Sequence, residues 1–271
     1  MTTMLDEKIA IVTGAGQGLG RSIAVEMARR GAGAIAVVDR REDTAAETAD
    51  LVRDLGAEAL AIACDLRDRD AIAAMVSETV ERFGGLDVLV NNAGIIESML
   101  TADCAVDTLP DEVWDAVYEV NLRAPWLATK LAAPHLRRSQ RGPSIVNAAS
   151  VSSHVGFANA PAYCATKGGV LQLTRAAAVD HARERIRINC VCPGAIDTPL
   201  FRQSVNERAA DPEAALRAAA ERHPIGRLLT PDDVAGAIAF LVDDGSAAIT
   251  GSALVVDGGL SATWQFSAIN K

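Results

Sequence analysis

The stretch "TGAGQGLG" at residues 13–20 decides how the rest of the chain is interpreted. It follows a short β-branched run and opens an amphipathic segment. Glycines in this context permit a tight turn, close approach of the backbone to a bound group, and tight packing of a helix on a sheet. Free N–H groups at the start of such a helix bind a pyrophosphate. The residues expected to contact the bound cofactor here are Gly14, Gln17, Gly18, Leu19 and Gly20.

Short apolar runs and longer amphipathic segments alternate along the chain. The runs lack polar alternation, so they predict parallel strands that are covered on both faces. The expected strands are Lys8–Thr13, Ala34–Asp39, Ala59–Asp65, Leu86–Asn91, Ser144–Ser150, Arg187–Val191 and Ala253–Val256. The expected helices are Gly18–Arg30, Thr44–Leu55, Asp68–Phe83, Asp111–Arg138, Ala160–His181 and Pro231–Leu241. This pattern predicts an α/β fold: a doubly wound parallel sheet of seven strands in three α/β/α layers, forming a single domain over residues 1–271.

Two longer segments interrupt this rhythm, each after the carboxyl end of a strand, where ligands of such sheets bind. The first is Ile95–Pro110, and the second, residues 194–227, is long enough to form a helical substrate-binding lobe. The chain ends in an extension, residues 262–271, that carries Trp264 and Phe266. We expect these aromatic residues to pack on a neighbouring subunit or to close a pocket.

An acidic residue, Asp39, ends the second expected strand, nineteen residues after Gly20. A carboxylate at this place binds both hydroxyls of an adenosine ribose and repels a 2′-phosphate, which favours NAD over NADP. Arg40 and Arg41 follow at once and could instead bind such a phosphate, so NADP remains open. We expect NAD as the cofactor, with Arg40 among its contacts.

Composition limits the possible partners. The net charge of −9 argues against a nucleic-acid partner, because phosphate binding requires a positive field. No apolar run approaches 18 residues and no signal peptide is visible, so we expect a cytoplasmic protein without a membrane partner. The five cysteines are scattered, and they predict buried thiols rather than disulfides. No Cys or His cluster completes a set of four ligands, so no metal is expected.

The stretch "AYCATKGGV", residues 162–170, contains one of only two tyrosines, with a lysine four positions later. On a helix, Tyr163 and Lys167 lie on one face. A phenol with a pKa of about 10 is a poor proton carrier at neutral pH, but a neighbouring cation stabilises its anion. The pair therefore suggests a proton-transferring tyrosine.

These motifs occur in an order that resembles the short-chain dehydrogenase/reductase family. They are T-G-x-x-x-G-x-G after the first strand, "NNAG" (91–94) after the fourth, Ser150 thirteen residues before Tyr163, Y-x-x-x-K, "PGAIDT" (193–198) and "VDGG" (256–259). The resemblance covers about residues 6–262. It implies a Rossmann-like sheet in the order 3-2-1-4-5-6-7 and a homotetramer. The cofactor contacts that it implies are Asp65, Leu66, Asn92, Ala93, Gly94, Tyr163, Lys167, Pro193, Gly194, Ile196 and Thr198.

The resemblance also implies four catalytic residues, namely Asn121, Ser150, Tyr163 and Lys167. Tyr163 is expected to act as the general acid or base, its pKa lowered toward neutrality by Lys167 and by the cationic ring of oxidised nicotinamide. Ser150 would hydrogen-bond the reacting oxygen. Lys167 would also hold the nicotinamide ribose, and Asn121 would position a water beside this lysine.

The function predicted from the sequence is hydride transfer between NAD(H) and a small secondary alcohol or ketone, with cyclic and sugar-like alcohols considered first. One alternative is an NADPH-dependent 3-oxoacyl-carrier-protein reductase, which would need a basic surface for an acidic carrier. Another is a nucleotide-binding scaffold without chemistry, for which loss of part of the catalytic set would be expected. All four positions are filled in this chain.

Overall fold

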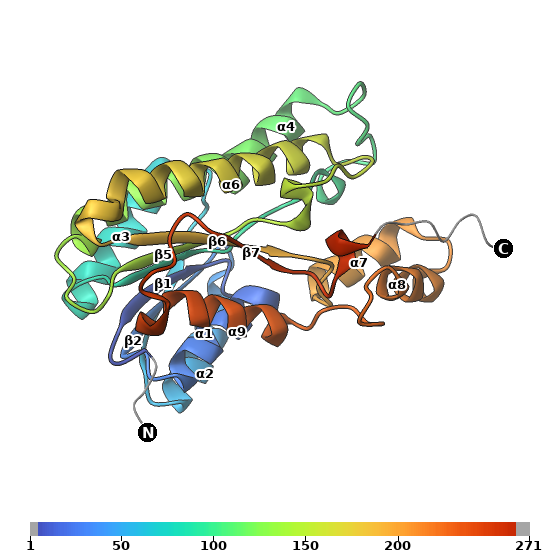
Figure 1. Cartoon of the computed structure of the whole chain (residues 1–271). Helices are drawn as coiled ribbons and strands as arrows, with labels where there is room; N and C mark the ends of the chain where they lie inside the picture. Colours follow the sequence, from blue (N-terminus) through green and yellow to red (C-terminus); the bar gives the residue numbers. More distant parts are fainter. Residues whose placement is uncertain (1–4, 264–271) are drawn as a thin grey trace.

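The computed structural model describes residues 5–263, and a single parallel sheet forms their centre (Figure 1). The strand order is β3-β2-β1-β4-β5-β6-β7, with every pair parallel, as predicted. The strands are β1 (Ile9–Thr13), β2 (Ala34–Asp39), β3 (Glu58–Ala63), β4 (Val88–Asn91), β5 (Ser144–Ala148), β6 (Arg187–Pro193) and β7 (Ala253–Val256). The order reverses between β1 and β4, which places a ligand crevice at their carboxyl ends.

The central strands form because their residues are buried on both faces, whereas the edge strands β3 and β7 are partly exposed. Every residue of β1, β4, β5 and β6 is buried, which explains the absence of polar alternation in the sequence. Several predicted ends were wrong by two residues, chiefly at the carboxyl edge. β3 and β5 end at Ala63 and Ala148, whereas β6 continues to Pro193. Ser150 consequently lies beyond its strand and caps a short 3₁₀ helix, η3 (Val151–Ser153).

Helices cover both faces of the sheet (Figure 1). One layer contains α1 (Gly18–Arg29), α2 (Glu42–Asp54) and α9 (Pro231–Val242). The other contains α3 (Arg69–Phe83), α4 (Asp111–Tyr118), α5 (Ala124–Leu136) and α6 (Pro161–His181). Each layer has its own apolar core against the sheet, which includes Ile23 and Ile238 on the first face and Ile72 and Leu136 on the second. The sheet is therefore a rigid platform for groups at its edges.

The predicted helix over residues 111–138 is interrupted. A π turn, η2 (Glu119–Arg123), separates α4 from α5. Pro125 explains part of this break, because it has no N–H to donate to the Asn121 carbonyl four residues before it. The wider turn contains Asn121, whose side chain is buried. Such π turns often occur at functional sites.

The segment after β6 forms two helices, α7 (Pro199–Arg208) and α8 (Pro212–Glu221). Each begins with a capping residue followed by proline, Thr198 for α7 and Asp211 for α8. Figure 1 shows both beyond the end of the sheet to which β6 leads. The predicted helical lobe is thus present, and its role in substrate binding stays a prediction. Trp264 and Phe266 fall outside the described residues.

Candidate active site

The glycine turn after β1 lies between two other segments of the carboxyl edge. Gly14 has a φ of +64°, and a Cβ on it would come within 2.9 Å of Ala93 Cα. Gly18 has a φ of +55°, and a Cβ there would lie 3.5 Å from Thr198 Cγ2. A Cβ on Gly20 would collide with the Gly14 carbonyl. Glycine is therefore required for the turn to fit between the "NNAG" and "PGAIDT" segments.

A threonine that the sequence analysis missed connects the glycine turn to "NNAG". The buried Thr13 hydroxyl accepts hydrogen bonds from the backbone N–H groups of Asn92 (3.0 Å) and Ala93 (3.2 Å). The Asn92 amide donates back to the Thr13 carbonyl at 2.9 Å. A polar residue at the end of a fully buried strand was the available signal. These bonds fix the two predicted cofactor segments against each other.

The carboxylate of Asp39 lies beside the glycine turn, as the ribose prediction requires. Its oxygens accept hydrogen bonds from the backbone N–H groups of Gly16 (2.9 Å) and Arg41 (3.1 Å). The Arg41 guanidinium instead pairs with Asp43 at 2.8 Å, so it is held away from this carboxylate. Arg40 is exposed at the same edge.

The predicted adenine residues lie next to Asp39. The N–H of Cys64 donates to the Asp39 carbonyl at 2.9 Å, which brings Asp65 and Leu66 to this edge. Asp65 forms an ion pair with Arg67, and the hydrogen bond from this guanidinium lowers the pKa of Asp65. Leu66 is partly buried against the apolar core. Their contact with adenine stays a prediction.

Tyr163 and Lys167 share a face of α6, as the four-residue spacing predicts. The Lys167 ammonium lies 5.7 Å from the centre of the tyrosine ring and donates to the Ala148 carbonyl at 2.7 Å. Lys167 is buried, and Tyr163 is partly buried. The Ser150 hydroxyl interacts with the Tyr163 phenol. Helix α6 and the end of β5 therefore bring three of the four predicted catalytic residues together.

Asn121 completes the group from the π turn. Its amide accepts from the Ile95 N–H and donates to the Ile95 carbonyl, both at 2.8 Å. A Cβ on Gly94 would lie 3.2 Å from the Lys167 ammonium and 3.4 Å from the Asn121 carbonyl oxygen, so glycine allows the three residues to meet. Both ends of the Asn121 amide thus bind Ile95. The water expected beside Asn121 stays a prediction.

Burial controls the proton affinities in this group. It raises the pKa of Tyr163, which the Ser150 interaction lowers and the charges of Cys164 and Glu97 raise. Burial also lowers the pKa of Lys167 to about 8. The predicted fall in the tyrosine pKa is therefore not produced by the protein alone, because desolvation outweighs the effect of its neighbours. The second cation in that prediction, the nicotinamide ring, belongs to the cofactor.

A buried histidine that the sequence analysis left without a role supports the segment after β6. The His223 Nε2 accepts from the Ala195 N–H at 3.2 Å, and its Nδ1 donates to the Ala219 carbonyl at 2.9 Å. A Cβ on Gly194 would lie 2.8 Å from the same Nε2. His223 thus connects α8 to the predicted nicotinamide segment, in which Ile196 forms a β-bridge with Leu229. A lone histidine in the sequence gave no signal of this contact.

The remaining polar chemistry does not form a metal centre in the described part of the chain. All five cysteines are free thiols. Within residues 5–263, no group of three or more His, Cys, Asp or Glu side chains is placed to hold a metal ion. In the same range, no helix combines the length and apolarity needed to cross a bilayer. A cytoplasmic location stays a prediction.

The fold and site together define a class of protein. A doubly wound parallel sheet, a glycine turn at its switch point, and Tyr, Lys, Ser and Asn at one edge are typical of oxidoreductases that use a nicotinamide cofactor. A family model described as enoyl-(acyl carrier protein) reductase matches residues 14–261. The chain belongs to the short-chain dehydrogenase/reductase family, whose members generally use a nicotinamide cofactor, and is an oxidoreductase.

Known proteins resemble the chain over nearly its full length. A cis-4-hydroxycyclohexanecarboxylate dehydrogenase from Sinomonas cyclohexanicum is 42% identical over 94% of this chain and 97% of the relative. A 3-oxoacyl-[acyl-carrier-protein] reductase from Thermotoga maritima is 37% identical over 94% and 98%. The crystal structure of levodione reductase superposes with a TM-score of 0.89 and 32% identity, covering 96% of this chain and all of that one.

Proposed function

We propose that the protein transfers a hydride between NAD(H) and a small cyclic secondary alcohol or its ketone, with Tyr163 as the general acid or base. One observation carries this proposal: the Tyr163 phenol, the Ser150 hydroxyl and the Lys167 ammonium meet at the sheet edge that also holds the glycine turn. Lys167 is buried and Tyr163 is partly buried beside it, unlike a pair on an exposed helix face with no catalytic role.

The residues perform separate tasks in this proposal. When bound, the nicotinamide ring exchanges a hydride with the carbinol carbon. Tyr163 takes the hydroxyl proton during oxidation and returns it during reduction. Ser150 donates a hydrogen bond to the reacting oxygen. Lys167, with a pKa of about 8, exchanges protons near neutral pH, and Asn121 holds the backbone of Ile95 beside it.

Two features support NAD as the cofactor. Gly14 and Gly18 have positive φ values that favour glycine, and a turn without side chains leaves backbone N–H groups free for a pyrophosphate. The Asp39 carboxylate beside the turn would bind ribose hydroxyls and repel a 2′-phosphate. Of the two arginines that could offset this repulsion, Arg41 pairs with Asp43, whereas Arg40 is exposed at the same edge. The residues present therefore fit NAD better than NADP.

Apolar side chains support a small, weakly polar substrate. Large hydrophobic residues remain exposed in the segments that follow β4, β5 and β6, and they are Met99, Leu100, Val155, Phe157 and Ile225. The first relative named above acts, by its name, on an alcohol carried by a cyclohexane ring. We therefore propose ring alcohols as the substrate class.

Reduction of a 3-oxoacyl group on a carrier protein is the second candidate, because a relative with that name is 37% identical. An acidic carrier requires a basic docking surface, and this chain has a net charge of −9. Asp39 also argues against the NADPH that the alternative requires. These observations favour the ring alcohol.

A spectrophotometric screen tests the proposal. Cyclohexanol-type alcohols are supplied with NAD⁺ or NADP⁺, and 3-oxoacyl thioesters with NADH or NADPH, while absorbance at 340 nm is followed. We expect turnover of the alcohols with NAD⁺, and a loss of about 10²–10⁴-fold in kcat in Tyr163→Phe with NADH binding retained. Turnover of thioesters with NADPH would instead support the alternative, and unchanged kcat in the variant would remove Tyr163 from the mechanism.

We also propose that the protein assembles as a homotetramer. Trp114, Tyr118, Leu122 and Trp126 recur every four residues along α4, η2 and α5, and the three aromatic residues are each more than 40% exposed. An exposed aromatic row of this kind marks a protein interface. Light scattering should give four times the mass of the chain, and Trp126→Glu should lower it. A monomer in both samples would contradict the assembly.

A further inference from the structure

The helix that carries Tyr163 begins without a cap of its own. Ala160 precedes α6 and has no side-chain acceptor, and Pro161 occupies the first position. The next two N–H groups, those of Ala162 and Tyr163, both donate to the Glu97 carboxylate, at 2.7 and 3.0 Å. A side chain 65 residues earlier in the chain therefore caps this helix, and one of its two hydrogen bonds is to Tyr163 itself.

Glu97 is buried much more deeply than a helix cap requires. Its exposed fraction is 0%, whereas Asp68 and Asp211, which cap α3 and α8, are exposed to solvent. The second carboxylate oxygen, Oε2, has no hydrogen-bond partner within the described residues. Burying a carboxylate with an unbonded oxygen costs several kcal/mol. An exposed cap would give the same helix without that cost.

The position of Glu97 connects the cofactor segment to the tyrosine. It starts a 3₁₀ turn, η1 (Glu97–Met99), three residues after Gly94. Ile95 lies two residues before Glu97, and both its N–H and its carbonyl form hydrogen bonds with the Asn121 amide. The residues directly after "NNAG" are thus bound to the π turn through Ile95 and to the first turn of α6 through Glu97. Any shift of α6 relative to this segment would break one of these contacts.

The groups that lie beside the Tyr163 ring or influence its pKa come from three elements. Lys167 and Cys164 belong to α6, Glu97 belongs to η1, and the Ser150 hydroxyl caps η3. The negative charge of Glu97 raises the pKa of Tyr163. Glu97 therefore affects Tyr163 in two ways: it accepts a hydrogen bond from the Tyr163 backbone N–H, and its negative charge raises the pKa of the phenol.

We propose that Glu97 is a positioning residue for the reaction, which holds the first turn of α6, and with it the Tyr163 phenol, in register with the cofactor segment. The proposal rests on the function proposed above. It assigns Glu97 no contact with substrate, because its side chain is fully buried.

Three substitutions separate this role from simple capping. Glu97→Gln keeps an oxygen that can accept from both N–H groups but removes the charge. Glu97→Leu removes both. Asp87→Asn is the matched control, because Asp87 is an equally buried carboxylate that accepts a backbone N–H, from Ile9, just before β4 and at the opposite edge of the sheet.

Titration of the tyrosine tests the inference without any turnover. The chain has two tyrosines, so the ultraviolet absorbance of tyrosinate in each protein, minus that of a Tyr163→Phe blank, reports Tyr163 alone. Glu97→Gln should ionise Tyr163 at a lower pH, because a negative charge that raises the pKa of Tyr163 has been removed. Asp87→Asn should leave the titration unchanged. Equal titration in wild type and Glu97→Leu would overturn the proposal, because Glu97→Leu removes both the charge and the hydrogen bonds to the first turn of α6.

Kinetics complete the test once the screen has given a substrate. Glu97→Leu should lower kcat at least about tenfold while KM changes little, because a misplacement of the order of 1 Å costs up to ~10²-fold. Glu97→Gln should recover most of kcat, with its pH profile moved to lower pH. An unchanged kcat in Glu97→Leu would reduce Glu97 to a cap. If wild type turns over no alcohol with either cofactor, the proposed function fails, and the titration still decides whether Glu97 sets the state of Tyr163.

Discussion

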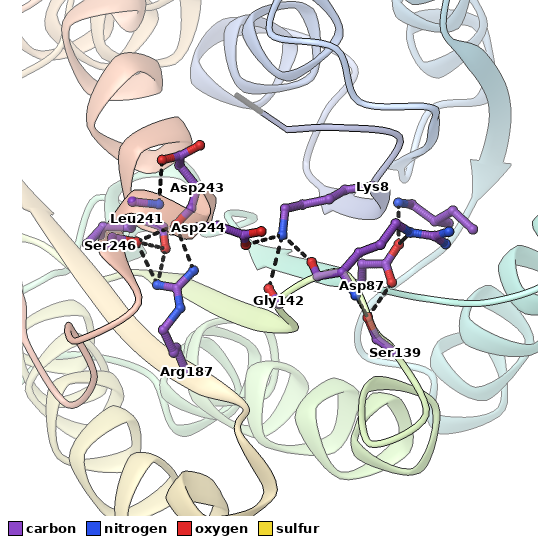
Figure 2. A network of polar contacts seen from close by, with 12 residues as sticks. Lys8, Asp87, Ser139, Gly142, Arg187, Leu241, Asp243, Asp244 and Ser246 are labelled. Atoms are coloured by element: carbon purple, nitrogen blue, oxygen red, sulfur yellow. Dashed lines mark hydrogen bonds and ion pairs between the residues drawn. The ribbon is translucent and has the colours of Figure 1, made fainter. Parts of the chain in front are cut away.

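Two buried lysines at opposite edges of the sheet have opposite surroundings. At the amino edge, the Lys8 ammonium donates to two backbone carbonyls and pairs with Asp244 at 2.8 Å (Figure 2). At the carboxyl edge, Lys167 donates to the Ala148 carbonyl, and within residues 5–263 no carboxylate lies close enough to pair with it. Burial dominates its pKa. The same residue type is thus neutralised at one edge and left unpaired at the other.

The other charged groups follow the same division. Figure 2 shows that Asp87 binds Ser139. It also shows Arg187 donating to the carbonyl of Leu241 in the last turn of α9, and to the Asp243 carbonyl and Ser246 hydroxyl just after it. Asp87 also pairs with Arg141 at 2.8 Å. A pocket of about 410 Å³ opens at this edge, but Arg187 in its wall already has its partners. The amino edge has therefore used its polar groups to hold the strand ends together.

The difference shows how one sheet separates stability from chemistry. Paired charges have fixed protonation states, and removing one partner leaves the other buried without a compensating charge. An unpaired buried lysine with a pKa of about 8 can change protonation near the pH at which a reaction runs, which is what proton transfer requires. Burying Lys167 without a partner at the carboxyl edge therefore lowers stability, but it leaves a group that can titrate.

Removal of the lysine at the carboxyl edge should have the largest effect. Lys167→Met keeps an apolar stem of similar length and removes the ammonium. We expect kcat to fall by about 10²–10⁴-fold, because Tyr163 loses the cation beside its ring. The free energy of unfolding at pH 7 should not decrease, because methionine can be buried without the desolvation penalty that lowers the pKa of Lys167. Steady-state kinetics and urea unfolding measure the two effects. A variant that is inactive only because it is unfolded would contradict the comparison.

The sheet itself was predictable because its cause is local. Parallel strands need continuous apolar runs, and the runs at residues 34–39 and 253–256 correctly predicted the bounds of β2 and β7, although β7 is only partly buried. The π turn was not predictable in the same way. A helical pattern continues through Asn121, and the break depends on Pro125 together with a partner, Ile95, distant in sequence.

The candidate site was predictable where a motif records a backbone constraint. Gly14 and Gly18 are favoured by their positive φ, and a Cβ on Gly14 would also crowd the Ala93 backbone, so they stand out in the sequence. Glu97 and His223 were missed because their roles exist only in three dimensions. Each accepts backbone hydrogen bonds from a distant segment, and no local spacing signals such a bond.

The pH dependence of stability should report the unpaired lysine directly. The pKa of Lys167 is about 8 in the folded protein and 10.5 in an unfolded chain. Between these values the unfolded chain binds the extra proton, so the free energy of unfolding rises with pH, by up to about 3 kcal/mol for this group. Below pH 8 both states are protonated and the slope is absent.

Urea unfolding of wild type and Lys167→Met at pH 7, 8, 9 and 10 isolates this slope. The free energy of unfolding of wild type should rise with pH relative to that of Lys167→Met, since the variant cannot titrate at this position. Measurements stop near pH 10, because the raised pKa of Tyr163 makes stability fall above the unfolded pKa of tyrosine. A constant difference across the range would show that Lys167 is not a titrating buried group.

The matched change at the amino edge should have the smallest effect of the three and the opposite sign. Lys8→Met removes an ammonium that holds two carbonyls and Asp244. Leaving buried carbonyls without a donor costs about 1–3 kcal/mol, so we expect the free energy of unfolding to fall by about 2 kcal/mol. The loss is limited because Asp244 is largely exposed and can be solvated. kcat should not change, because no predicted catalytic residue lies at this edge.

Thermal and urea unfolding at pH 7, with kinetics on the same samples, check this expectation. Arg217→Met, which breaks the exposed pair with Glu213, is the control and should give no measurable change. Equal stability changes in Lys8→Met and Lys167→Met would mean that pairing does not distinguish the two edges. A fall in stability for Lys8→Met alone, with kcat retained, would tie the strength of the amino edge to its ion pairs and the activity to the edge that lacks them.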